Sequence, residues 1–190
     1  MNESNEPEDT LVGRCRDGDA DAFRTLVEKY SRMLFVTAYL MTRDRGMAED
    51  AVQSALVKMW QKLPSLRRND SFKAWLARIV VNEVNRQRRK KRPPTVPIDE
   101  SPEVPNDPPE MEAAIFHDEE SRRLRQALDV LPSGQREAVV LRYFSDLTVP
   151  EVAAATGERE GTVKSRLSRA LDRLGEVLGK DEMFQDRRQR

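Results

Sequence analysis

The chain has one cysteine and one histidine among its 190 residues, so it is poor in the side chains that form disulfides and transition-metal sites. A single cysteine excludes an internal disulfide, and the sequence shows no Cys and His spacing typical of zinc. Cys15 follows apolar Leu11 and Val12 in a helical pattern, which predicts a buried structural thiol. His117 lies in an acidic stretch and is expected on the solvated surface. Neither residue is assigned a metal or a reaction.

Long apolar runs are also lacking. No run approaches the roughly 18 residues that a membrane span needs, and the acidic N-terminus MNESNEPEDT is unlike a secretory signal. The glycine-rich phosphate loop, HExxH and GxSxG motifs do not occur in the sequence. Carboxylates are numerous, but they concentrate in the Pro-rich segment that is expected to be a flexible linker, and such a segment would not hold them in a fixed geometry for catalysis. The sequence therefore favours a cytoplasmic, non-catalytic protein without membrane insertion or cofactors.

Positive and negative charges balance overall but are unevenly distributed. The chain has 33 Lys and Arg against 33 Asp and Glu. Ten of the basic residues lie between positions 67 and 92, where only two acids occur, and positions 93–120 hold nine acids and no Lys or Arg. A local basic block attracts phosphate even when the net charge is zero. Nucleic acid therefore remains a candidate partner.

The patterning divides the chain into two helical domains joined by a linker. Residues 1–10 are expected to be disordered, 11–92 to form the N-terminal domain, 93–110 a flexible linker, 111–179 the C-terminal domain and 180–190 a tail. The linker is rich in Pro and acid, so it buries too little apolar surface to offset its ordering entropy. No convincing strand alternation is present, which predicts an all-α fold class.

The N-terminal domain is predicted to contain about four helices, over 11–17, 20–42, 47–63 and from Ser71, the expected N-cap, into the basic run. The third helix stops at Pro64 and shows one apolar stripe. That expected core stripe consists of Ala51, Val52, Ala55, Leu56, Met59, Trp60 and Leu63. The opposite face carries Asp50 and Gln53, with Glu49 at its edge. Spacing alone indicates only a solvated face there.

Residues 147–174 are the most informative segment, because they predict two short helices around a tight turn. Thr148 and Glu151 have the spacing of a capping box, and Gly157 allows the first helix to end. A second helix, predicted from near Thr162, buries Val163, Leu167, Ala170, Leu171 and Leu174. Its outer face carries Lys164, Ser165, Ser168, Arg169 and Arg173. The pattern is typical of a helix-turn-helix whose second helix enters a DNA major groove. A bundle corner with a solvated face is the alternative.

The segment 66–92 is a second candidate site, because Phe72 and Trp75 are interleaved with basic side chains. Aromatic walls beside positive charge suit a single nucleic-acid strand. The preceding polar loop could line a pocket for a base taken out of the stack. The alternative is that both aromatic residues belong to the core, which is favoured for Trp75 taken alone.

Together these motifs resemble the extracytoplasmic-function (ECF) sigma factors of bacterial RNA polymerase, in the sigma-70 family. LDVLPSGQREAVVLRYFSDLTVPEVAAATGEREGTVKSRLSRALDRL resembles their region 4, and DAFRTLVEKY, AEDAVQSALVKMW and SFKAWLARIVVNEVNRQRRKKR resemble their region 2. The resemblance covers about residues 11–92 and 129–174 and is closest to the envelope-stress sigma-E branch. It implies a non-catalytic alternative-sigma subunit that binds core polymerase and directs promoter-specific initiation. A conventional helix-turn-helix activator or repressor is the alternative function.

The resemblance also implies a role for each surface. Glu49, Asp50 and Gln53 would dock on the clamp helices of the largest polymerase subunit, and the beta flap is a second expected contact. Recognition and melting of the single-stranded −10 element would use Arg67, Arg68, Asn69, Asp70, Ser71, Phe72, Trp75, Asn82, Asn85 and Arg86. Reading of the −35 duplex would use Thr162, Lys164, Ser165, Arg166, Ser168 and Arg169. An anti-sigma factor is implied as a further partner, which could hold the protein at the inner membrane face.

Overall fold

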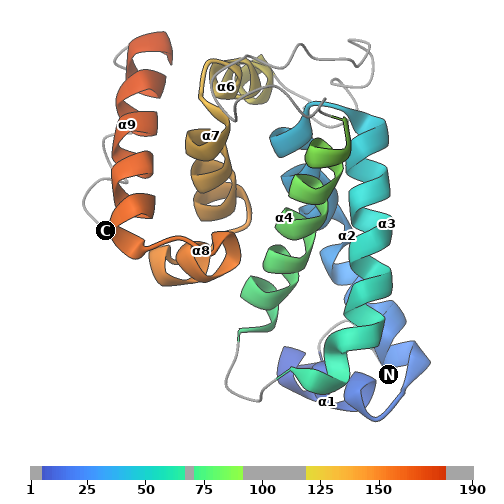
Figure 1. Cartoon of the computed structure of the whole chain (residues 1–190). Helices are drawn as coiled ribbons and strands as arrows, with labels where there is room; N and C mark the ends of the chain where they lie inside the picture. Colours follow the sequence, from blue (N-terminus) through green and yellow to red (C-terminus); the bar gives the residue numbers. More distant parts are fainter. Residues whose placement is uncertain (1–5, 67–70, 92–118, 179–190) are drawn as a thin grey trace.

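The computed structural model describes residues 6–66, 71–91 and 119–178, and within these ranges it contains helices and turns but no strand. The N-terminal domain consists of α1 (Glu8–Arg16), α2 (Ala20–Thr42), α3 (Arg45–Lys62), the 3-10 turn η2 (Leu63–Ser65) and α4 (Phe72–Lys91). The C-terminal domain consists of α6 (Glu119–Asp129), α7 (Ser133–Val139), the π-helical turn η3 (Val140–Phe144), α8 (Val149–Thr156) and α9 (Glu160–Leu178). The predicted all-α class is confirmed for the described residues (Figure 1). The expected linker, His117 and the C-terminal tail lie outside them.

Polar side chains cap three helices of the N-terminal domain, and one of these caps, Ser71, was predicted. The Asp19 carboxylate accepts two backbone N–H groups of α2, and Asp44 accepts the Met47 N–H at 2.9 Å. Ser71 Oγ accepts the Ala74 N–H at 3.3 Å, which confirms Ser71 as the N-cap of α4. Each such cap stabilises its helix by about 1 kcal/mol. The bounds of α2 are those that the sequence predicted.

The first helix starts earlier than expected. Residues 8–10 were assigned to a disordered N-terminus, but α1 begins at Glu8. The Tyr30 hydroxyl of α2 donates a hydrogen bond to the Glu8 carboxylate, and Lys29 Nζ lies 3.7 Å from it. These long-range contacts, which the local pattern does not show, hold the start of α1 against α2.

Trp60 corrects the predicted core stripe of α3. Its side chain is 44% exposed, whereas neighbouring Met59 is fully buried. Val52 and Leu56 are only partly buried. Consecutive residues of a helix point about 100° apart. When both are apolar, one lies at the centre of the buried face and the other lies at its edge. Trp60 takes the edge, where its ring packs edge-on against Phe23 with 4.8 Å between ring centroids.

The helix-turn-helix forms as predicted from α8 and α9. Both the backbone N–H and the hydroxyl of Thr148 donate to the Glu151 carboxylate at 2.8 Å, and Gly157 ends α8 with φ +73°. The second helix begins at Glu160, two residues before the predicted start near Thr162. Four of its five predicted core residues are buried: Val163, Leu167, Ala170 and Leu174.

The two domains pack against each other in a closed arrangement. Helix α4 lies against α8, and α2 lies against η3 and α7 (Figure 1). The hydroxyls of Thr37 on α2 and Ser145 after η3 are 2.9 Å apart and buried. Arg43 Nε, at the end of α2, lies 2.7 Å from the Asp129 carboxylate of α6. Buried polar contacts therefore join the domains.

Candidate nucleic-acid and protein interfaces

The outer face of α9 presents the predicted duplex-reading side chains to solvent. Lys164, Ser168 and Arg169 are exposed and point away from α7 and α8. The Arg169 guanidinium donates to Ser165 Oγ at 2.7 Å, and Lys164 Nζ lies 3.9 Å from Glu160. Both contacts are local to the helix, so the charged ends can reach a ligand by a rotamer change.

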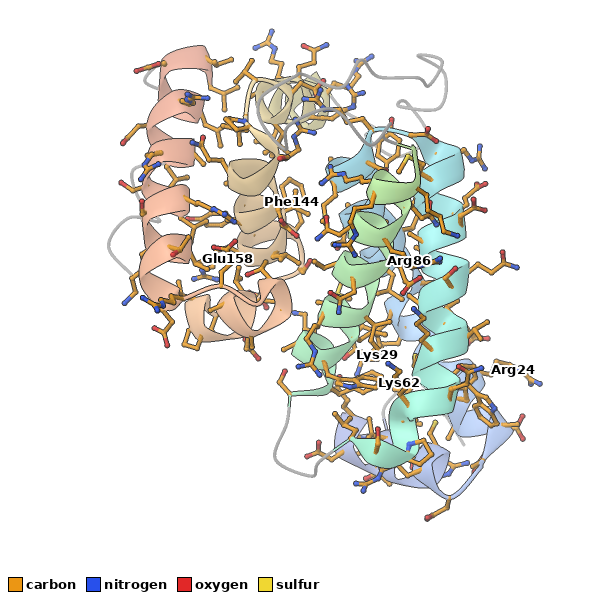
Figure 2. The ribbon with its side chains drawn as sticks, in the orientation of Figure 1. Arg24, Lys29, Lys62, Arg86, Phe144 and Glu158 are labelled. Carbon is orange, nitrogen blue, oxygen red and sulfur yellow. The ribbon has the colours of Figure 1, made fainter. Side chains whose placement is uncertain are left out.

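Arg166 differs from the other residues predicted for this face. Its Nη2 lies 2.8 Å from the Glu158 carboxylate, and its side chain is 30% exposed. The guanidinium covers Gly134 of α7 so closely that a Cβ at Gly134 would lie 3.1 Å from its Cζ. Arg166 thus ties α9 to α7 and to the turn that carries Glu158, which Figure 2 labels beside α9. Thr162 is partly buried in the first turn of α9.

The two aromatic residues of α4 are buried to different extents. Phe72 is buried at 4% exposure, and its ring centroid lies 5.4 Å from that of Tyr30. Trp75 is only partly buried. Because Phe72 fills the N-terminal core, it positions the start of α4, whereas Trp75 packs against the core and stays partly exposed.

Helix α8 faces the first half of α4 across a cavity of about 380 Å³. Ser71, Trp75 and Arg78 line one wall and α8 lines the other. The Ser71 side chain hydrogen-bonds to Glu151, and Lys73 Nζ lies 3.2 Å from Asp146. Acidic groups of the C-terminal domain therefore contact the segment predicted to bind single-stranded nucleic acid.

The second half of α4 also lies against an acidic side chain of the C-terminal domain. Asn85 Nδ2 donates to Glu137 Oε1 of α7 at 3.4 Å, while Asn82 is exposed. Burial raises the pKa of Glu137, although the charge of Arg88 and the Asn85 hydrogen bond oppose this shift. Arg86 pairs with Glu83 of its own helix. The predicted loop residues Arg67, Arg68, Asn69 and Asp70 lie outside the described residues.

The exposed face of α3 carries the predicted protein-binding residues. Glu49, Asp50 and Gln53 are all exposed. Sequence patterning missed that Val57 (53% exposed) and Trp60 extend this face by one to two helical turns. Their positions, four and seven residues after Gln53, were the available signal. An acidic, polar and apolar stripe of this kind fits a protein partner better than DNA.

A groove of about 480 Å³ joins this face to α4. Asp44, Asp50 and Gln53 lie on its α3 side, and Arg86 and Lys90 lie on its α4 side. The groove brings the predicted protein-binding and DNA-binding residues together, a proximity that the linear sequence does not reveal.

The described part of the chain has few features typical of a metal site or a reactive group. No group of three His, Cys, Asp or Glu side chains in those ranges is placed to hold a metal ion. Burial raises the pKa of the Cys15 thiol to about 11, and its 3% exposure confirms the predicted buried thiol. No described helix combines the length and apolar character needed to cross a membrane.

Comparison with known protein families gives two matches that follow the domain division. The family "Sigma-70 region 2" matches residues 26–93, and "Sigma-70, region 4" matches residues 121–174. The chain is 36% identical over 163 residues to the ECF RNA polymerase sigma factor SigM of Mycobacterium tuberculosis, covering 85% of this chain and 80% of that protein. It is 30% identical to the ECF RNA polymerase sigma-E factor of Escherichia coli, covering 86% and 90%.

Solved structures resemble the chain over nearly its whole length. CnrH, in complex with the cytosolic domain of CnrY, matches with a TM-score of 0.67 and 26% identity, covering 92% of this chain and 98% of that one. The sigma factor RpoE from Bartonella quintana, in complex with the anti-sigma factor NepR, matches with a TM-score of 0.65 and 30% identity, covering 85% and 99%.

Proposed function

The chain belongs to the ECF sigma factors of bacterial RNA polymerase, and we propose that its α9, α4 and α3 surfaces divide the work of such a subunit. It is an alternative-sigma subunit that directs transcription initiation. Catalysis of phosphodiester bond formation belongs to the polymerase, and this chain supplies specificity without a cofactor of its own.

The α9 surface reads the −35 duplex in the major groove. The observation that carries this assignment is the exposed row Lys164, Ser168 and Arg169 on the second helix of a helix-turn-helix. Arginine can donate two hydrogen bonds to a guanine edge, and lysine neutralises a phosphate. Ser165 is half-buried beside Arg169, so it orients that guanidinium. Thr162, at the N-terminal turn, is placed for a phosphate contact.

The α4 surface captures the −10 strand. Trp75 is partly exposed and is proposed to stack on a base, and Asn82, Asn85 and Arg86 continue along the same helix. The polar loop 67–70 would receive a flipped base, whose unstacking costs a few kcal/mol that the pocket must recover. Phe72 contributes indirectly, because its burial against Tyr30 fixes the start of α4.

The α3 surface binds core polymerase at the clamp helices of the largest subunit. Glu49, Asp50 and Gln53 supply polar contacts, and exposed Val57 and Trp60 supply apolar area beside them. The C-terminal domain contacts the beta flap. Such a subunit works in the cytoplasm, where polymerase and promoter DNA are found.

Reading both promoter elements requires the domains to separate. The −35 and −10 elements are about 25 base pairs apart, which corresponds to about 85 Å at 3.4 Å per base pair. A compact chain of this length has a radius of gyration of about 16 Å. Contacts such as Asn85–Glu137 and Ser71–Glu151 must therefore break on the polymerase. Once both domains are held, each contact raises the effective concentration of the other.

An anti-sigma factor is proposed to regulate this protein. The RpoE structure, 30% identical to this chain, contains the anti-sigma factor NepR. An anti-sigma factor that prefers the closed arrangement would keep this chain from polymerase by mass action. Such a partner could hold it at the inner membrane face.

A run-off transcription assay tests the proposed function. Purified core polymerase receives promoter DNA from the source genome, with and without the protein. The proposal predicts protein-dependent start sites that share −35 and −10 sequences at constant spacing. The absence of transcripts and of co-elution with core polymerase, together with tight duplex binding by the protein alone, would instead identify an activator or repressor.

A further inference from the structure

Glu83 on α4 is the one acidic side chain within the described residues that is fully buried, with 1% exposure. Acidic residues are seldom buried to this extent without partners. The side chain points from α4 towards α3, into the layer between the helix proposed to bind polymerase and the helix proposed to bind DNA.

Two cations from two helices meet the Glu83 carboxylate. Lys58 Nζ of α3 pairs with Oε1. Arg86 donates to the other oxygen, Oε2, through Nη2 at 2.8 Å and Nε at 2.9 Å. Figure 2 shows the labelled Arg86 on the side of α4 that faces α3. Two hydrogen bonds to one charged oxygen hold the guanidinium in place more firmly than a single bond would.

The carboxylate is charged in this arrangement. Burial by itself raises the pKa of Glu83, but the hydrogen bonds and charges of Lys58 and Arg86 outweigh it and lower the pKa below its ordinary value. One negative and two positive charges leave a net charge of +1. The buried acid therefore does not cancel the local positive field, and it determines where the two cations lie.

We propose that Glu83 is a positioning residue for promoter opening, which holds the Arg86 guanidinium ready for the −10 strand. This inference rests on the proposed function. A purely structural link between α3 and α4 needs only Lys58, which uses Oε1. The second oxygen instead holds Arg86, whose side chain is 41% exposed and lines the groove shared with Asp50 and Gln53. A long exposed side chain is thereby ordered before its ligand arrives.

A double-mutant cycle distinguishes positioning from a structural role. Glu83→Gln keeps the shape of the side chain but removes its charge, and Arg86→Gln removes the positioned group. With core polymerase and a promoter, each single variant should slow formation of the permanganate-reactive open complex by about tenfold. The double variant should be no slower than Arg86→Gln alone, because the effect of Glu83 passes through Arg86.

Lys58→Met provides the matched control. It removes the other partner of Glu83 while Arg86 remains attached to Oε2, so opening should stay near the wild-type rate although stability falls. Core-polymerase binding and −35 duplex binding should be unchanged in all four variants. Circular dichroism of each variant establishes that it is folded at the assay temperature, and Glu83→Asp, which keeps the charge, should recover part of the rate.

Two results would overturn the inference: opening at the wild-type rate in Glu83→Gln, or a double variant in which the two slowing factors multiply. If Glu83→Gln does not fold, the same cycle is run with Glu83→Asp, whose shortened carboxylate should slow opening only while Arg86 is present. A wild-type protein that gives no promoter-specific transcript refutes the proposed function itself. A slow Arg86→Gln beside a normal Glu83→Gln refutes only the positioning role.

Discussion

Asp129→Asn should open the closed arrangement without unfolding either domain. Asp129 is a counter-ion of two buried guanidinium groups: Arg43 from the N-terminal domain at 2.7 Å and Arg125 from its own helix at 3.3 Å. The side chains of both arginines are about 5% exposed or less. Removing one partner of a buried pair costs about 3–5 kcal/mol, because the other charge stays buried.

Domain separation gives Arg43 a route back to water, so part of that cost should appear as opening. Small-angle scattering should show a radius of gyration above the roughly 16 Å of a compact chain, while circular dichroism shows nearly unchanged helicity. Asp146→Asn is the matched control: it removes another carboxylate between the domains, but one that is 84% exposed. Exposed pairs contribute about 0–1 kcal/mol. A compact Asp129→Asn protein of wild-type stability, or equal effects of both substitutions, would refute this reasoning.

Four further outcomes are expected. Asp50→Arg should weaken association with core polymerase in a pull-down without lowering the melting temperature, because the residue is exposed. Normal association would show that the polymerase-binding surface does not include this face of α3. Arg169→Ala should reduce discrimination at one −35 base pair by about 1–3 kcal/mol in competition binding with holoenzyme, and unchanged promoter choice would remove it from the readout. Cys15 should react with iodoacetamide at pH 8 about a hundredfold more slowly than in denatured protein, because burial raises its pKa from 9.0 to about 11; equal rates would contradict its burial. The stability difference between wild type and Glu83→Gln should be full above pH 4.5 and shrink as the pH falls through the lowered pKa of the folded state, whereas a difference constant from pH 3 to pH 7 would show that the charge is not involved.

Much of the fold could be predicted because its signals are local. Helix α2 has a clear N-cap at Asp19 and a continuous apolar face, and its bounds were predicted correctly. The capping box of Thr148 with Glu151 and the positive φ of Gly157 likewise follow from neighbours in sequence. Patterns of this kind depend on a few residues that the chain itself brings together.

The errors share a physical cause, which is contact between distant segments. Glu8 begins a helix that Tyr30 of α2 contacts, and Trp60 lies at the edge of the buried face of α3, where Phe23 of α2 packs against it. The assignment of Arg166 to the DNA face stays a prediction, but its contacts with Glu158 and Gly134 could not be read from the sequence pattern. Periodicity ranks positions around a helix without showing which neighbour covers them.

The sequence did not predict that the two domains pack against each other, for the same reason. Thr37 and Ser145 are 108 positions apart, and no local pattern pairs them. Their hydrogen bond is favourable only because the surrounding interface excludes water. Similarly, Asp50 and Arg86 line one groove through the packing of α3 on α4.

The most direct test of the account joins positions 37 and 145 covalently, so that the two domains cannot separate. The hydroxyls of Thr37 and Ser145 are 2.9 Å apart, so cysteines at both positions, in a Cys15→Ala background, would bring two thiols close together for oxidation to a disulfide, whose formation is checked by thiol titration. Run-off transcription with core polymerase is then compared between the reduced and oxidised forms of this variant. The account predicts promoter-specific transcripts from the reduced form and none from the oxidised form, whose domains cannot reach both promoter elements. Equal transcription from the two forms would contradict it.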